Sequence, residues 1–233
     1  MGVLVIPEPG VSYIVVNRII RSLKNAGDFA KEHEERQKID KIIRRLESSF
    51  QKFVSLARDF SRDIGEGKDA EEWLIENVPK IWSLKVEFLP DFQMALEVLP
   101  EIKGKTFRDI AGEMESEVED EDIRTLLKII RDMDMKGLDI YLQQNINELS
   151  AEMLRRMINL YAIVDFLALV MMLSDKGEVV LPDKGKIRRI FRKYLNDLAE
   201  FWADVELLKE MEENETGELI SIDEIMAVLN DEG

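Results

Sequence analysis

The stretch LYAIVDFLALVMML, residues 160–173, decides the fold. Asp165 is its only charged residue. A membrane-spanning helix needs about 20 apolar residues, so this run is too short to cross a bilayer. A soluble helix that is apolar on all sides is one that other helices surround. We therefore expect residues 151–173 to form the central helix of an all-α protein.

Asp165 is the exception within this run, and it is the buried-acid candidate of the chain. A carboxylate in apolar surroundings either finds a partner or stays protonated. Asp165 is therefore either part of an ion pair or hydrogen bond that fixes the register of the helix, or a perturbed acid that lines a pocket. The first interpretation is favoured, because structural ion pairs also shift pKa values.

Two longer helices with heptad spacing are predicted, over residues 28–64 and 186–212. In each, apolar residues recur at alternating intervals of three and four. The first stripe is Ile43, Leu46, Phe50, Phe53, Ala57, Phe60 and Ile64; the second is Ile187, Phe191, Tyr194, Leu198, Phe201, Val205 and Leu208. Two matched stripes predict that these helices pack on each other, roughly 20° from parallel or antiparallel.

Proline, glycine and charge divide the rest of the chain. Because proline suits the first position of a helix, Pro79, Pro90 and Pro100 predict short helices over residues 69–112. Val3–Ile6 and Val179–Leu181 are β-prone and could pair as a tiny two-stranded element. The predicted organisation is an irregular helical bundle over residues 1–212, followed by an acidic linker and a short amphipathic helix over 213–233.

Composition narrows the class of protein. The chain has 233 residues and no cysteine, so disulfides and thiolate chemistry are excluded and a reducing, cytoplasmic location is favoured. Its N-terminus lacks the basic region of a secretory signal, and no membrane association is expected. Abundant Glu, Lys and Arg give a thermophile-like composition. The net charge of −16 repels phosphate backbones on average.

No motif assigns a catalytic residue, a metal ligand or a cofactor. His33 is the only histidine and lies in KEHEER, where an exposed polar residue is expected. Glycine-rich phosphate loops are absent from the sequence. Glu32 with Glu35, and Glu117 with Asp120, have the spacing of a carboxylate-only magnesium site. Among 48 acids such pairs arise by chance, so solvated charge is favoured and a magnesium-dependent nucleotide hydrolase is the third functional alternative.

A basic segment, KGKIRRIFRK at residues 184–193, stands out in this acidic chain. Its six bases are Lys184, Lys186, Arg188, Arg189, Arg192 and Lys193. They could contact phosphates or an acidic partner, as in an accessory subunit of a nucleic-acid-processing complex. Pairing with the chain's own acidic run EMESEVEDED, residues 113–122, or with its acidic tail is favoured.

The tail SIDEIMAVLN, residues 221–230, has one apolar face. Ile222, Ile225, Met226 and Leu229 form this face, at helical spacing. A helix this short is marginal alone in water, so it needs a groove in its own domain, in a second copy or in another protein. The leading hypothesis is therefore a non-enzymatic scaffold or adaptor subunit with protein partners, the chain itself among them.

Overall fold

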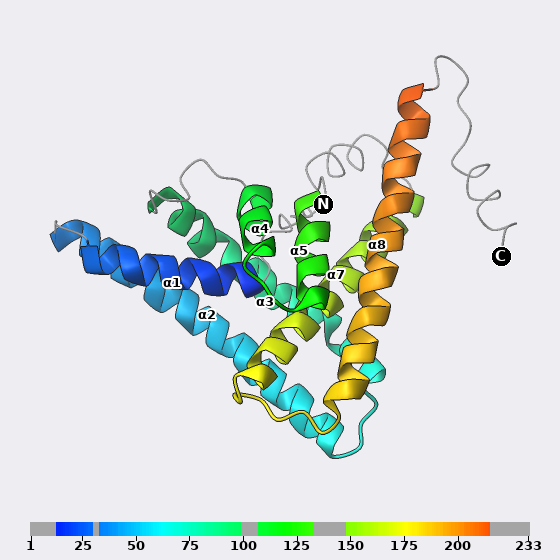
Figure 1. Cartoon of the computed structure of the whole chain (residues 1–233), viewed down its shortest axis with the longest axis horizontal. Coiled ribbons are helices and arrows are strands. Elements are labelled where there is room, and N and C mark those ends of the chain that lie inside the picture. Colours follow the sequence, from blue (N-terminus) through cyan, green and yellow to red (C-terminus); the bar gives the residue numbers. More distant parts are fainter. Residues whose placement is uncertain (1–12, 30–32, 99–106, 133–147, 215–233) are drawn as a thin grey trace, which may run out of the picture. The chain divides into compact units, whose positions relative to one another are not determined.

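The computed structural model describes residues 13–29, 33–98, 107–132 and 148–214 (Figure 1). Every regular element in these ranges is a helix, which confirms the all-α prediction. The helices are α1 (Tyr13–Phe29), α2 (His33–Gly65), α3 (Ala70–Val98), α4 (Phe107–Glu115), α5 (Glu121–Asp132), α7 (Glu148–Asp175) and α8 (Lys184–Asn214). Val179–Leu181 lies in the loop between α7 and α8, and Val3–Ile6 lies outside the described residues, so their pairing stays a prediction.

The chain divides into two compact units, Met1–Leu198 and Ala199–Gly233. The division falls inside α8, ahead of the predicted linker at 213–233. The first unit contains α1 to α7 and the start of α8. The second contains the rest of α8, and the chain from residue 215 onward lies outside the described residues.

Helix α7 is the centre of the first unit, as the sequence predicts. Every residue from Leu160 to Met171 is buried, and α7 packs against α1, α2 and α3. By length and composition the segment Arg155–Asp175 could also cross a membrane. However, 78% of its most apolar stretch is buried within the fold, as in the core helix of a soluble protein.

An aromatic cluster joins α2, α3 and α7. The ring centroids of Phe60 and Trp73 are 4.9 Å apart, and that of Phe166 lies 5.7 Å from Phe60 and 5.8 Å from Trp73. The Trp73 indole also donates a hydrogen bond of 3.0 Å to Asp63 near the end of α2. Three helices are therefore held together by edge-to-face and stacked ring contacts, with the polar edge of the indole satisfied.

The prediction of short helices over residues 69–112 is wrong for residues 70–98, which form the single helix α3. Pro79 and Pro90 lie inside one helix that runs to Val98. Both prolines are exposed, so water can bind the carbonyl groups that lose their helical partner. Buried residues on the opposite side of α3, including Leu74 and Ile81, hold the helix against its neighbours on both sides of Pro79. The start of α3 is as predicted, because Asp69 accepts hydrogen bonds from the amides of the first turn.

Helix α2 has the predicted apolar stripe but a different partner. Leu46, Phe53, Ala57 and Phe60 are buried. Across the described residues α2 packs mainly against α1 and α3, so the expected packing of the two long helices on each other is wrong. An unbroken α3 supplies a long neighbour for α2, which short helices would not. The predicted helix 28–64 also divides, because α1 ends at Phe29 and α2 begins at His33.

Phe166→Ala should lower the free energy of unfolding by about 3–5 kcal/mol, because it leaves a cavity between three helices. Urea unfolding followed by far-ultraviolet circular dichroism would measure this change. Val180→Ala is the control: Val180 is 81% exposed, and its truncation should change stability by less than about 0.5 kcal/mol. Equal effects of the two substitutions would contradict the central place of the cluster.

Candidate functional site

The acid of the central helix has a buried cationic partner. Asp165 of α7 accepts a hydrogen bond from the ammonium group of Lys85 on α3, and both side chains are 0% exposed. The Lys85 ammonium also lies 4.3 Å from the ring centroid of Tyr161, one turn before Asp165 on α7. A cation between a carboxylate and an aromatic face is stabilised from both sides. This arrangement is the ion pair of the first interpretation of Asp165.

Burial controls the protonation of this cluster. It lowers the pKa of Lys85, against the attraction of Asp165, which raises it. Burial also raises the pKa of Tyr161 well above its usual value, and the charge of Asp165 adds to that rise. Tyr161 therefore stays neutral. Since neither charged side chain reaches solvent, the pair fixes how α3 and α7 meet.

The basic segment 184–193 pairs with acids of the same chain. Arg192 lies 2.8 Å from Asp122, and Arg188 pairs with Asp120 and, at 3.3 Å, with Asp122. Three further pairs are Lys193 with Glu71 at 2.6 Å, Lys186 with Asp69 at 3.5 Å, and Lys184 with Asp175. Arg189 has no carboxylate at ion-pair distance among the described residues. Five of the six candidate residues thus contact acids from α3, α5, α7 and the residues just before α3 and α5.

Two of these acids also begin helices. Asp69 caps α3, and Asp120 caps α5 through the amides of Asp122 and Ile123. A base brought close to the positive end of a helix is unfavourable by itself. Here the capping carboxylates of Asp69 and Asp120 pair with Lys186 and Arg188 of α8 and offset this repulsion. The basic segment therefore fastens α8 to the starts of α3 and α5.

The carboxylate pairs considered for magnesium are placed differently. Glu117 lies 2.8 Å from Arg18, and Asp120 pairs with Arg188, so both members of this pair have cationic partners. Glu32 lies outside the described residues. In the described ranges no three acids, histidines or cysteines gather as a metal site would require. His33 is exposed and hydrogen-bonded to Gln37 at 2.9 Å.

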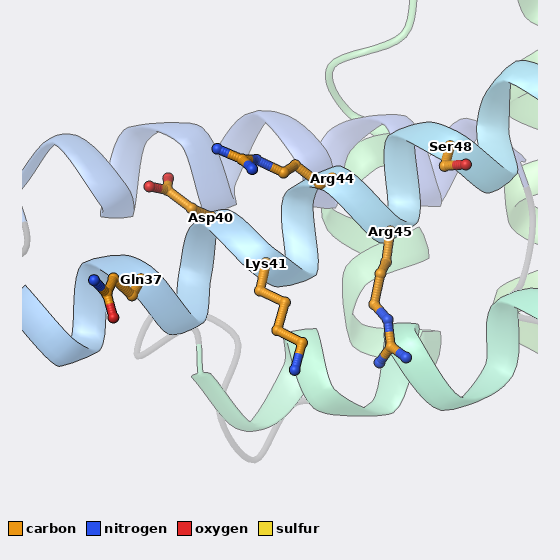
Figure 2. A pocket seen from close by; sticks show the side chains of 6 residues that line it. All are labelled: Gln37, Asp40, Lys41, Arg44, Arg45 and Ser48. Carbon is orange, nitrogen blue, oxygen red and sulfur yellow. The ribbon is translucent and has the colours of Figure 1, made fainter.

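A further polar surface lies on the solvent side of α2, and we call it the α2 polar face. It surrounds a shallow hollow of about 440 Å³. Its six side chains are all exposed and are drawn in Figure 2: Gln37, Asp40, Lys41, Arg44, Arg45 and Ser48. Three are bases and one is an acid. In Figure 2, Lys41 and Arg45 point to the same side of α2, and Arg45 pairs with Asp91 of α3 at 3.2 Å.

Lys41 and Arg44 have no carboxylate at ion-pair distance within the described part of the chain. Arg44 and Ser48 also border a second hollow, of about 430 Å³, between α1 and α2. On the α1 side of that hollow, Lys24 pairs with Glu47 at 2.6 Å. The α2 polar face is therefore an exposed, base-rich surface on which two of the three bases have no ion pair in the described part of the chain.

The α2 polar face was not among the sites predicted from the sequence. Its residues recur at Gln37, Lys41, Arg44 and Ser48, on the side of the helix opposite to the apolar stripe, a spacing that the sequence displays. The residues Ile222, Ile225, Met226 and Leu229 of the predicted partner-binding helix lie outside the described residues.

Comparison with protein-family models, curated proteins and solved structures finds no match for this chain.

Lys85→Met should lower the free energy of unfolding by about 3–5 kcal/mol, because it leaves the Asp165 carboxylate buried without its cation. The double variant Lys85→Met/Asp165→Leu should recover most of this loss or exceed the stability of the wild type by up to about 4 kcal/mol. Urea unfolding of the two single variants and the double variant gives the coupling between the sites. Additive losses would show that the two side chains do not act as a pair.

The charge of Asp69 should stabilise the fold only above acidic pH. The Glu72 amide, assisted by Glu71 and Lys186, lowers the pKa of Asp69 below its ordinary value of 3.8. An acid with a lowered pKa stabilises the folded state fully above its ordinary value, and the effect disappears as pH falls through the folded-state pKa.

Asp69→Asn keeps the capping oxygen but removes the charge. It should therefore be less stable than the wild type at pH 7 and nearly equal to it well below pH 3.8. Asp69→Ala removes the cap as well and should remain less stable at both values. Thermal unfolding across this pH range would measure the differences. A constant gap between wild type and Asp69→Asn would contradict the assignment.

Proposed function

We propose that this chain is a non-enzymatic protein-interaction subunit, a scaffold or adaptor within a larger intracellular assembly. The α2 polar face is the observation that carries this proposal. Lys41 and Arg44 are exposed on one side of a long helix whose other side is locked into the core. Side chains that project from a rigid helix form a contact surface with little ordering of the backbone, which favours recognition of a partner.

The tail supports the same function independently. Its residues Ile222, Ile225, Met226 and Leu229 have the spacing of a helix that lies in an apolar groove. A chain with a rigid polar contact surface and a short apolar recognition segment is suited to joining other proteins. Both features act through binding and need no chemical step.

A nucleic-acid role is supported less well. It depends on free bases in the segment 184–193, where five of six now contact carboxylates. To reach a phosphate they would have to exchange an intramolecular carboxylate for it. The magnesium hydrolase alternative is weakened in the same way, since Glu117 and Asp120 each face an arginine.

Reversing the charge of the α2 polar face should remove specific partners. Tagged full-length protein is used as bait in native lysate, and the captured proteins are compared with those of Lys41→Glu/Arg44→Glu. Lys128→Glu on α5 is the matched control, because Lys128 is exposed and has no ion pair in the described part. We expect the double variant to lose proteins that the wild type and the control retain, and identical sets would contradict the role of α2.

The contribution of the tail is tested by the same capture with a chain that ends at Gly217. The truncated bait should lose the proteins that bind through residues 221–230. Capture of no specific protein by the full-length bait would refute the interaction function itself.

A further inference from the structure

We propose that the α2 polar face binds the acidic C-terminal segment, residues 206–233, of a second copy of this chain. This inference rests on the proposed function and names one partner for it. It is an electrostatic contact: the exposed Lys41 and Arg44, together with Arg45, face carboxylates of the partner copy.

Most acids of the run 113–122 are paired with arginines outside α2. In the run 113–122, Glu113 and Glu117 lie 3.9 and 2.8 Å from Arg18. Glu115 pairs with Arg131, and Asp120 and Asp122 pair with Arg188 and Arg192. Five of the seven acids of this run are therefore already paired within the same copy.

The C-terminal segment holds the remaining concentrated acid. Its ten acids are Glu206, Glu210, Glu212, Glu213, Glu215, Glu218, Asp223, Glu224, Asp231 and Glu232, and its one base is Lys209. The chain thus contains an exposed base-rich face, on which Lys41 and Arg44 have no carboxylate at ion-pair distance in the described part of the chain, and one strongly acidic segment. Their charges are complementary.

The two surfaces also match in length. From Gln37 to Ser48 the α2 polar face extends about 16 Å, at 1.5 Å per residue. The stretch from Glu210 to Glu218 contains five acids, and because it is helical as far as Asn214 it spans at most about 20 Å. Carboxylates of this stretch can therefore contact both Lys41 and Arg44.

A second copy is the occupant that uses this complementarity most fully. In a pair with twofold symmetry each copy donates its acidic segment and receives the other, so every contact is made twice. The overall charge of −16 opposes random association between copies. Association between copies therefore requires that the bases of α2 lie directly opposite acids of the partner copy.

The sign of the salt dependence separates the two effects. If general repulsion dominated, added salt would screen it and increase association. If bases of α2 bind acids of the partner copy, added salt weakens association. Phosphate polymers would also be released from α2 by salt, but they would not cause association of the pure protein.

The test is sedimentation velocity on the pure full-length chain, at about 0.05 M and about 0.5 M salt. We expect self-association at low salt that weakens at high salt. In Lys41→Glu/Arg44→Glu the dissociation constant should rise about tenfold or more, since two attractive contacts become repulsive. The variant Glu212→Lys/Glu213→Lys/Glu215→Lys should show the same loss, and Lys128→Glu should associate like the wild type.

Mixing the two charge-reversed variants decides whether the contact joins separate chains. In the mixture the unchanged acidic segment of one variant meets the unchanged α2 polar face of the other, and the introduced lysines meet the introduced glutamates, so association should return although neither variant associates alone. Circular dichroism checks that both variants keep their helices. A wild type that is monomeric at low salt, association that grows with salt, or a mixture that stays monomeric would each overturn the proposal.

These outcomes are independent of the proposed function. A chain that captures other proteins through α2 but does not associate with itself keeps the function and loses this inference. Retention of a monomeric wild type on immobilised nucleic acid at low salt, abolished in Lys41→Glu/Arg44→Glu, would instead assign the α2 polar face to phosphates.

Discussion

The buried pair of Lys85 and Asp165 is the constraint on which the arrangement of the first unit depends. Helix α7 is apolar around most of its circumference, and such a surface specifies neither its rotation nor its position along its axis. Asp165 removes this freedom, because its charge can lie only where a cation meets it inside the core. Lys85 supplies that cation from α3, and the ring of Tyr161 covers it. Apolar burial makes α7 central, and the ion pair gives it one orientation.

The sequence predicts the first half of this constraint and not the second. A continuous apolar run predicts that α7 is buried, and a single acid within this run predicts that the acid has a partner for its charge. The partner is hidden, because Lys85 lies 80 positions away and a lysine between Leu84 and Val86 resembles an ordinary surface residue. The length of α3 is hidden for a related reason. Pro79 and Pro90 have the local signature of helix starts, and only their exposed position on a packed helix allows the helix to continue.

For the charged surface too, contacts between residues that are close in the sequence can be predicted, and contacts that depend on the packing of helices cannot. Asp69 is recognisable as a helix cap from its neighbours, and the pairing of basic segment with acidic run is anticipated for Arg188 and Arg192. Nothing in the sequence connects Lys193 with Glu71, since that contact depends on how α8 meets α3. The α2 polar face is less evident in the sequence than the apolar stripe of the same helix. It has three bases between residues 41 and 45, whereas the basic segment on α8 has six between residues 184 and 193 and is therefore more conspicuous.

A large group of bases in the sequence does not show that these bases are available to bind another molecule. The conspicuous bases of α8 are engaged with caps and acids that begin two other helices, so they contribute to the fold. On α2, Lys41 and Arg44 lie one helical turn apart and have no carboxylate at ion-pair distance in the described part of the chain. Exposed bases without an ion pair also occur elsewhere in the described part of the chain, as Lys128 and Arg189 show. Lys41 and Arg44 differ from these two in lying one turn apart on a rigid helix beside Arg45, and this grouping suits them to contact another molecule.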